Sequence, residues 1–162
     1  MTVKIRSATL MDYGPICNLM TQIDALHRST HPGRFCETKP VREKAFLQSW
    51  LDDTDKHIWV AESSSSLAGV VMFFVRHTPD IPFIVPRRFI QVDTLVVDEH
   101  QQRKGIGQAL MQAVHQWGRE HHISDIELGV WAFNEAAIAF YQHLGYEILY
   151  HKMGQKLDDP SS

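Results

Sequence analysis

With 162 residues, of which 44% are hydrophobic, the chain suits one domain with one sizeable core. A formal net charge of -3 and the lack of an evident basic face argue against nucleic acid as a partner. No apolar run approaches the roughly twenty residues of a membrane span, and residues 1–6 lack the apolar segment of a secretory signal. We therefore expect a cytoplasmic protein without a membrane partner.

Cysteines and histidines give little sign of a metal site. Cys17 and Cys36 are too few for a disulfide framework and lack a paired-ligand spacing, so we expect both to be reduced. Among the ten histidines, only His27 and His31 stand at a helical ligand spacing, and Pro32 ends any helix there. We expect no metal.

The first fifty residues predict a strand and two helices. Alternating apolar and polar residues predict a strand over Val3 to Ala8, after which Asp12 can cap a helix that ends around residues 24–27. A loop over residues 28–40 contains two prolines and a glycine, and helical periodicity resumes from Val41 to Leu51.

Two strands follow, and then a proline-rich segment. The strands are predicted at His57 to Glu62 and Leu67 to Val75, with the polar run Ser63 to Ser66 suited to a hairpin turn. Residues 76–88 contain three prolines with apolar residues between them, which predicts a stiff excursion. This excursion could line an acceptor pocket or meet a partner subunit, so the sequence is compatible with a homodimer.

The remaining elements complete an α/β pattern. Apolar and β-branched residues from Phe89 to Val97 predict a central strand, followed by a polar loop and a helix that begins near Gly105. Later elements are a strand over 124–131, a short helix from Asn134 to Gly145, and closing strands at 146–150 and 151–157. We expect one domain over residues 1–157 and a polar tail over 158–162.

The turn between the central strand and the long helix is predicted to bind an anion. It consists of Gln102, Arg103, Lys104, Gly105, Ile106 and Gly107. A helix start exposes unpaired N–H groups with partial positive charge, and the two glycines remove side chains that would block a phosphate. Arg103 and Lys104 add cationic charge, so a pyrophosphate is the natural ligand.

Two other interpretations of this turn stay open on spacing alone. The glycines could only permit close packing of a helix on a sheet. They could also belong to a dinucleotide fingerprint, which fits poorly because a seven-residue polar loop precedes Gly105 and because Glu127 lies inside its strand rather than at its end.

The pattern Gln-x-x-Gly-x-Gly after a strand and before a long helix resembles the acetyl-CoA signature of the GCN5-related N-acetyltransferases (GNAT family). Asn134 and the run Phe140-Tyr141-x-x-x-Gly145-Tyr146 resemble that family's second conserved segment at the usual distance. The resemblance covers essentially the whole chain. It implies a mostly antiparallel mixed sheet, splayed between its fourth and fifth strands and flanked by helices, with acetyl-CoA as co-substrate.

Acetyl transfer to an amine needs a donor for the carbonyl, a base for the amine and an acid for the thiolate. The resemblance assigns the carbonyl to backbone N–H groups near Leu95, Val96 and Val97, if the strand bulges there. Asp93 is the candidate base, because it is the sole acidic residue of an apolar strand, with Gln91 on the same face to help hold a water. The alternative for Asp93 is a structural ion pair.

For the acid, Tyr141 matches the family tyrosine that reaches the cofactor sulfur, although it also falls on the apolar stripe of its helix and could be a core aromatic. Asn134 is assigned to the cofactor's pantetheine chain by resemblance, or it only caps its helix. The sequence thus predicts an N-acetyltransferase for a small primary amine, attracted by Asp24, Glu37 or Glu43. A protein amine acetyltransferase or a non-catalytic acyl-CoA sensor are the alternatives.

Overall fold

The computed structural model describes residues 3–63 and 66–157, so the expected tail at 158–162 lies outside the described part. The chain divides into two compact units, Met1–Gly129 and Val130–Ser162. The expectation of a single domain over 1–157 stays a prediction.

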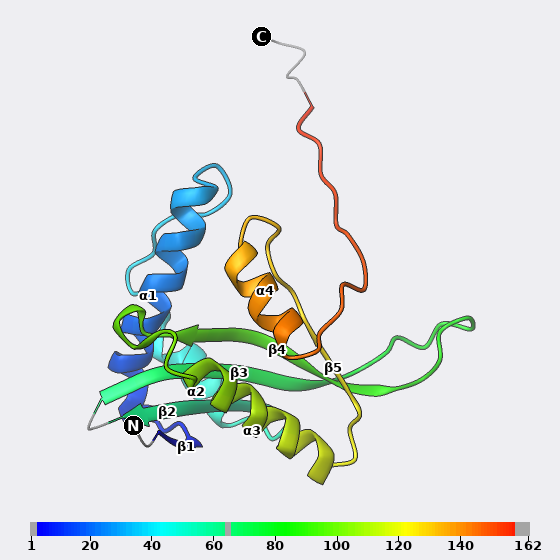
Figure 1. Cartoon of the computed structure of the whole chain (residues 1–162), viewed down its shortest axis with the longest axis horizontal. Coiled ribbons are helices and arrows are strands. Elements are labelled where there is room, and N and C mark those ends of the chain that lie inside the picture. Colours follow the sequence, from blue (N-terminus) through cyan, green and yellow to red (C-terminus); the bar gives the residue numbers. More distant parts are fainter. Residues whose placement is uncertain (1–2, 64–65, 158–162) are drawn as a thin grey trace. The chain divides into compact units, whose positions relative to one another are not determined.

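The first unit contains one mixed sheet of five strands in the order β1-β2-β3-β4-β5 (Figure 1). The strands are β1 (Lys4–Ser7), β2 (Lys56–Ser63), β3 (Ser66–His77), β4 (Arg88–Val97) and β5 (Asp125–Leu128). Neighbouring strands are antiparallel except for β4 and β5, which are parallel. The predicted α/β class and the mostly antiparallel mixed sheet are confirmed.

Helices cover both faces of this sheet. The helices of the unit are α1 (Tyr13–Thr30), α2 (Lys44–Leu51) and α3 (Ile106–Glu120). Residues of α1 and α2 share a core with Val70 and Met72 of β3. The next β3 residue, Phe73, points to the opposite face, where its ring lies 5.3 Å from that of Trp117 in α3.

The N-terminal helices differ from the sequence prediction at three points. The first helix does not end at residues 24–27 but continues to Thr30, because the first helix breaker is Pro32 and only His31 before it leaves the helical region. The second helix begins at Lys44 rather than Val41, since the carbonyl of Arg42 accepts from the Tyr13 hydroxyl instead of joining a helix. Asp12 does not cap α1 with its side chain.

The Asp12 carboxylate instead binds the opening strand. Its two oxygens accept from the guanidinium of Arg6 at 2.9 Å each, and one also accepts from the backbone N–H of Thr9. Asp12 is buried, so this bidentate pair fixes the start of α1 to β1.

The proline-rich segment connects β3 and β4 as a long excursion, as predicted (Figure 1). Phe83 and Val85 are exposed in it, and Arg87 at its end forms an ion pair with Glu127 of β5. Its role as acceptor pocket or subunit contact stays a prediction. Within the described ranges, no helix combines the length and the apolar character needed to cross a membrane.

The second unit contains α4 (Glu135–His143) with both predicted ends. The side chain of Asn134 caps the N-terminus by accepting from the N–H of Ala137 at 3.2 Å. Gly145 has φ +91° and ends the helix, with N–H groups of Gly145 and Tyr146 donating to the carbonyls of Gln142 and Tyr141.

The predicted closing strands at 146–150 and 151–157 are wrong. Among the described residues after Leu128 there is no strand, and Ile148, Leu149 and Tyr150 are exposed. Alternating apolar residues can form a strand only where a neighbouring strand accepts their backbone hydrogen bonds, and this segment has no such pairing.

Candidate active site

The sheet opens between β4 and β5. The two strands pair only from Phe89 opposite Asp125 to Val92 opposite Leu128. Beyond Val92, the second half of β4 is paired on one side only, with β3. The predicted splay between the fourth and fifth strands is therefore present, and β5 is shorter than the predicted 124–131.

A β-bulge lies where the strands separate. Met72 of β3 is opposite Thr94, whereas the next residue, Phe73, is opposite Val92, so Asp93 is the extra residue of β4. The bulge thus occurs two residues before Leu95, slightly upstream of the predicted position. A bulge redirects side chains, and Asp93 becomes exposed in an otherwise apolar strand.

The bulge also sets the direction of the backbone groups that follow it. The N–H of Asp98, directly after β4, donates to the carbonyl of Ala68 in β3 at 2.9 Å. Because the N–H groups of successive residues point to opposite sides of a strand, the N–H of Val96 also points toward β3. The N–H groups of Leu95 and Val97 point away from β3. Of the three residues predicted to bind a carbonyl, Leu95 and Val97 have the suitable orientation.

The charge of Asp93 acts on Arg42, which pairs with another carboxylate. Its Oδ2 accepts from the Thr94 hydroxyl at 2.8 Å, and it forms no ion pair among the described residues. Asp24 of α1 binds Arg42 at 2.7 and 3.2 Å and raises the pKa of that guanidinium, with a smaller contribution from the charge of Asp93. The ion-pair alternative for Asp93 therefore finds no support in the geometry, and the catalytic role stays a prediction.

Arg42 is the residue that the sequence analysis missed in this region. It neutralises Asp24, which was expected to attract an amine, while Glu37 lies 3.7 Å from Lys39. Among the described residues, neither Asp93 nor Glu43, the third acidic residue expected to attract an amine, forms an ion pair. Asp24 and Arg42 lie on different elements, so their spacing in the sequence does not indicate that they pair. Gln91 donates to the carbonyl of Val92 at 3.3 Å, and its expected part in holding a water stays a prediction.

The predicted anion turn follows β4 directly. The side chain of Gln102 donates from Nε2 to the carbonyl of Val97 at 3.3 Å, which closes the turn on the end of the strand. Lys104 donates from Nζ to the carbonyl of His100 and to Oε1 of Gln101 at about 3 Å. Arg103 has φ +58° and makes no hydrogen bond or ion pair with the part of the chain that the structure describes.

The start of α3 is suited to bind a phosphate. Gly105 precedes the helix with φ +80°, a conformation that favours glycine, and no side chain caps the helix start. The first intrahelical bond joins the N–H of Ala109 to the carbonyl of Gly105, so the N–H groups of Ile106, Gly107 and Gln108 precede the ladder. These donors, together with Arg103, fit the pyrophosphate of a coenzyme A group.

In the second unit, Tyr141 is half-buried, with its ring 5.1 Å from that of Phe140 and 5.6 Å from that of Tyr146. Burial raises the pKa of the Tyr141 hydroxyl to about 12. The hydroxyl therefore stays protonated through the physiological range, as an acid must. The capping role of Asn134 is confirmed, and its contact with a cofactor stays a prediction.

Comparison with known sequences identifies the family. Residues 20–146 match the sequence profile of the Acetyltransferase (GNAT) family. The chain belongs to this family. In this GNAT chain, the matched range includes the bulge of β4, the anion turn, α3 and α4, and it ends at Tyr146.

Curated relatives of this GNAT chain are N-acetyltransferases. Human N-acetyltransferase 8 is 31% identical over 100 residues, which are 62% of this chain and 42% of the human protein. Rat N-acetyltransferase 8 is 28% identical over 101 residues, 62% of this chain and 43% of the rat protein. The chain therefore spans less than half the length of these relatives.

Solved structures share the fold over nearly the whole chain. The tetramutant of the BH1408 protein from Bacillus halodurans has a TM-score of 0.91 and 27% identity, covering 95% of this chain and 99% of that chain. An aminoglycoside acetyltransferase from an uncultured soil metagenomic sample, in complex with trehalose, has a TM-score of 0.71 and 19% identity. It covers 96% of this chain and 97% of its own, and at this identity it shows the fold alone.

Proposed function

We propose that the protein is an acetyl-CoA-dependent N-acetyltransferase that transfers the acetyl group to a primary amine of a small molecule by direct attack. The observation that carries the proposal is the start of α3, where three backbone N–H groups precede the helical ladder beside Arg103, which has no ion-pair partner among residues 3–63 and 66–157. Acetyl-CoA supplies the activated thioester. The following roles concern the chain's own residues.

The anion turn binds the pyrophosphate. The N–H groups of Ile106, Gly107 and Gln108 point out of the helix start and combine with its partial positive charge. Arg103 adds a full positive charge, and Gln102 holds the turn against Val97. Lys104 contributes charge while its ammonium ties the turn to His100.

The open edge of β4 supplies the donors for the acetyl carbonyl and the carboxylate that accepts the amine proton. The N–H groups of Leu95 and Val97, directed away from β3, are the donors for the oxygen as it gains negative charge. Asp93, exposed at the bulge, accepts the proton of the amine directly or through a water. Its negative charge also attracts a cationic amine, a role for which Asp24 is less suited because Arg42 neutralises it.

Tyr141 supplies the proton that the departing thiolate takes up. The support for this role is its match to the family tyrosine and its protonated state, since burial raises its pKa to about 12. Asn134 contributes a contact to the pantetheine chain while capping α4.

The test is calorimetric titration with acetyl-CoA, with NADH titrated in parallel. We expect acetyl-CoA to bind and NADH not to bind, since the polar loop before Gly105 separates this turn from a dinucleotide fingerprint. A thiol-release assay with a panel of small amines and amino-terminal peptides then distinguishes the acceptor classes. Binding of acetyl-CoA without thiol release from any acceptor would indicate a sensor, and absence of binding would overturn the proposal.

A further inference from the structure

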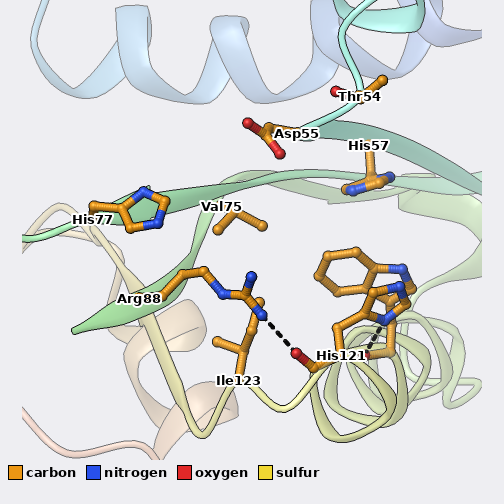
Figure 2. A pocket seen from close by; sticks show the side chains of 9 residues that line it. Thr54, Asp55, His57, Val75, His77, Arg88, His121 and Ile123 are labelled. Carbon is orange, nitrogen blue, oxygen red and sulfur yellow. Dashed lines mark hydrogen bonds between the residues drawn. The ribbon is translucent and has the colours of Figure 1, made fainter.

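A second cavity lies at the other end of α3. It has a volume of about 230 Å³ and is formed by the turn before β2, the end of β3, the start of β4 and the last turn of α3 (Figure 2). Trp117 in its wall is eleven residues after Ile106, which corresponds to about 16 Å along the helix. The cavity is therefore separate from the anion turn, and no step of the proposed acetyl transfer uses it.

Two opposite charges face this cavity from different strands. Asp55 precedes β2 and Arg88 begins β4, and Figure 2 shows them on opposite sides of Val75, with the Arg88 side chain extending toward the carbonyl of His121. β2 and β4 flank β3 and are therefore about 10 Å apart across the sheet. Asp55 bonds Val75 of β3 and Arg88 is opposite His77, two residues further along. Neither Asp55 nor Arg88 forms an ion pair with any residue in 3–63 or 66–157, although each is charged.

The guanidinium of Arg88 is already oriented. Its Nη2 donates to the carbonyl oxygen of His121 at 2.6 Å, which leaves the other N–H groups of the fork for an anionic group. A carboxylate is the anion that this planar fork binds best in a small site, and an ammonium is the natural partner of the Asp55 carboxylate. With one full charge of each sign, the lining favours a dipolar ligand over a simple anion, which Asp55 would repel.

The rest of the wall combines apolar and aromatic residues with Thr54 and the histidines His57, His77 and His121. Val75 and Ile123 line the cavity, and the Trp117 ring stacks on that of His121 at 4.0 Å. Apolar walls with a few convergent polar groups are typical of small-molecule sites. A cavity of this volume has room for a molecule of amino-acid size.

His57 provides an additional polar group that lacks a partner. Its Nε2 is buried and has no hydrogen bond within the described residues, although its ring contacts Trp117 at 4.6 Å. Burial lowers the pKa of His57, with a further decrease from His121, so the ring is neutral near pH 7. A buried nitrogen without a partner costs about 1–3 kcal/mol, and a polar group of a ligand can remove this cost.

We propose that this cavity binds a small zwitterion of amino-acid size, with its amine on Asp55, its carboxylate on Arg88 and an apolar side chain against Val75 and Trp117. The charge arrangement, the wall composition and the volume all agree with this class of ligand. His77, which also lines the cavity, adds a ring nitrogen beside the carboxylate position.

The first test is calorimetric titration with L-leucine, L-valine and L-methionine at millimolar concentration, without acetyl-CoA. For the tightest binder of the three, the matched compounds that lack only the amine or only the carboxylate are titrated next. We expect each deletion to weaken binding about tenfold or more, the effect of one charge-assisted hydrogen bond. No binding of any of the three, or equal binding of a compound with a single charge, would overturn the proposal.

The second test locates the ligand. Arg88→Gln and Asp55→Asn should each weaken binding about tenfold, whereas the matched controls Arg119→Gln and Asp52→Asn should not change it. Arg119 is on α3 but bonds Gln116 of its own helix, and Asp52 bonds Gln48, so both controls remove a charge outside the cavity. If Arg88→Gln does not fold, the affinity of Asp55→Asn alone decides whether the amino acid binds in this cavity.

The acceptor site could also bind an amine, and Asp93→Asn separates the two sites. We expect this variant to retain the affinity for the amino acid. If Asp93→Asn abolishes binding while Arg88→Gln and Asp55→Asn do not, the amino acid is bound in the proposed active site and the second site is refuted. This readout does not depend on acetyl transfer, so the two proposals can fail independently.

Discussion

Gln102 donates a hydrogen bond from Nε2 to the carbonyl oxygen of Val97, and this bond joins the first residue of the anion turn to the last residue of β4. The motif glutamine thus has a structural role that its position in the pattern did not reveal. It holds the helix start of α3 next to the strand whose N–H groups face the open edge. We therefore expect loss of this bond to disturb the positions of both the anion turn and the open edge of β4.

For Gln102→Ala, we expect the free energy of unfolding to fall by about 0.5–1 kcal/mol, the net value of one hydrogen bond. The affinity for acetyl-CoA should fall several-fold, because the donors at the start of α3 are less well oriented. Urea unfolding and calorimetric titration measure these two effects. Gln142→Ala, an exposed glutamine of α4, is the control, and equal affinity in both variants would contradict the assigned role.

Gly107→Val tests the helix start itself. A β-branched side chain in the first turn of α3 places bulk beside the N–H donors of Ile106 and Gln108, so we expect loss of detectable acetyl-CoA binding. Gly33→Val is the matched control, because nothing lies within 4 Å of a Cβ at Gly33. Calorimetry that shows the same affinity in Gly107→Val and the wild type would remove the turn from the cofactor site.

Sequence periodicity was sufficient for the elements that pack on the sheet. The helix predicted near Gly105 and the strand predicted from Leu67 to Val75 are both present, as α3 and within β3. Residues 68–73 of β3 are buried without interruption because helices cover both faces of the sheet. The helix ends at Asn134 and Gly145 were also predictable, because a capping side chain and a glycine with positive φ act within one turn of the chain. The β-bulge at Asp93 was not predictable from the pattern alone, since one extra residue in a strand has no signature in composition.

Contacts between distant segments were the part that the sequence could not provide. Asp12 resembles a helix cap in sequence, but its carboxylate binds Arg6 of the neighbouring strand. Asp24 resembles a free acidic residue, but Arg42 pairs with it from a loop eighteen residues later. The segment 146–157 has a strand-like pattern without a pairing partner, because pairing depends on the position of a neighbouring strand rather than on alternation.

Asp93→Asn distinguishes a base from a structural residue. Asp93 is exposed and, within the described part of the chain, bonds only its neighbour Thr94, so the free energy of unfolding should change by no more than about 0.5 kcal/mol. The turnover number should fall about a hundredfold if the carboxylate accepts the amine proton. Thiol release across a pH series measures this, with Asp80→Asn in the exposed excursion as control; unchanged turnover would exclude Asp93 as the base.

Tyr141→Phe should leave acetyl-CoA affinity unchanged and lower the turnover number about a hundredfold, since it removes only a hydroxyl. Thiol release and calorimetry provide the two readouts. Tyr146→Phe is the matched control, because it removes the hydroxyl of the neighbouring ring. If both variants turn over like the wild type, Tyr141 is a core aromatic.

The same tyrosine makes an alkaline prediction. Its pKa in the folded protein is about 12, above the ordinary value of 10.0, so between these values the unfolded chain has lost the proton that the folded chain retains. Stability should therefore decrease as the pH rises from 10 toward 12. Urea midpoints measured over this range should decrease less in Tyr141→Phe than in the wild type.

Asp12→Asn tests the pair that fixes α1 to β1. The hydrogen bonds from Arg6 hold the pKa of Asp12 below its ordinary value of 3.8, so the unfolded chain binds a proton at a higher pH than the folded chain. The contribution of the pair is thus fully present above about pH 5 and is lost as the pH falls through the lowered pKa.

At neutral pH, we expect Asp12→Asn to lower the free energy of unfolding by about 2 kcal/mol, since the carboxylate is buried but Arg6 is partly exposed. Urea unfolding at pH 7 and in the acidic range measures both effects, and the difference between variant and wild type should shrink on acidification. Asp53→Asn is the control, because Asp53 pairs with Lys56 at the surface; a difference that stays constant down to acidic pH would show that the Arg6 pair does not stabilise the fold through its charge.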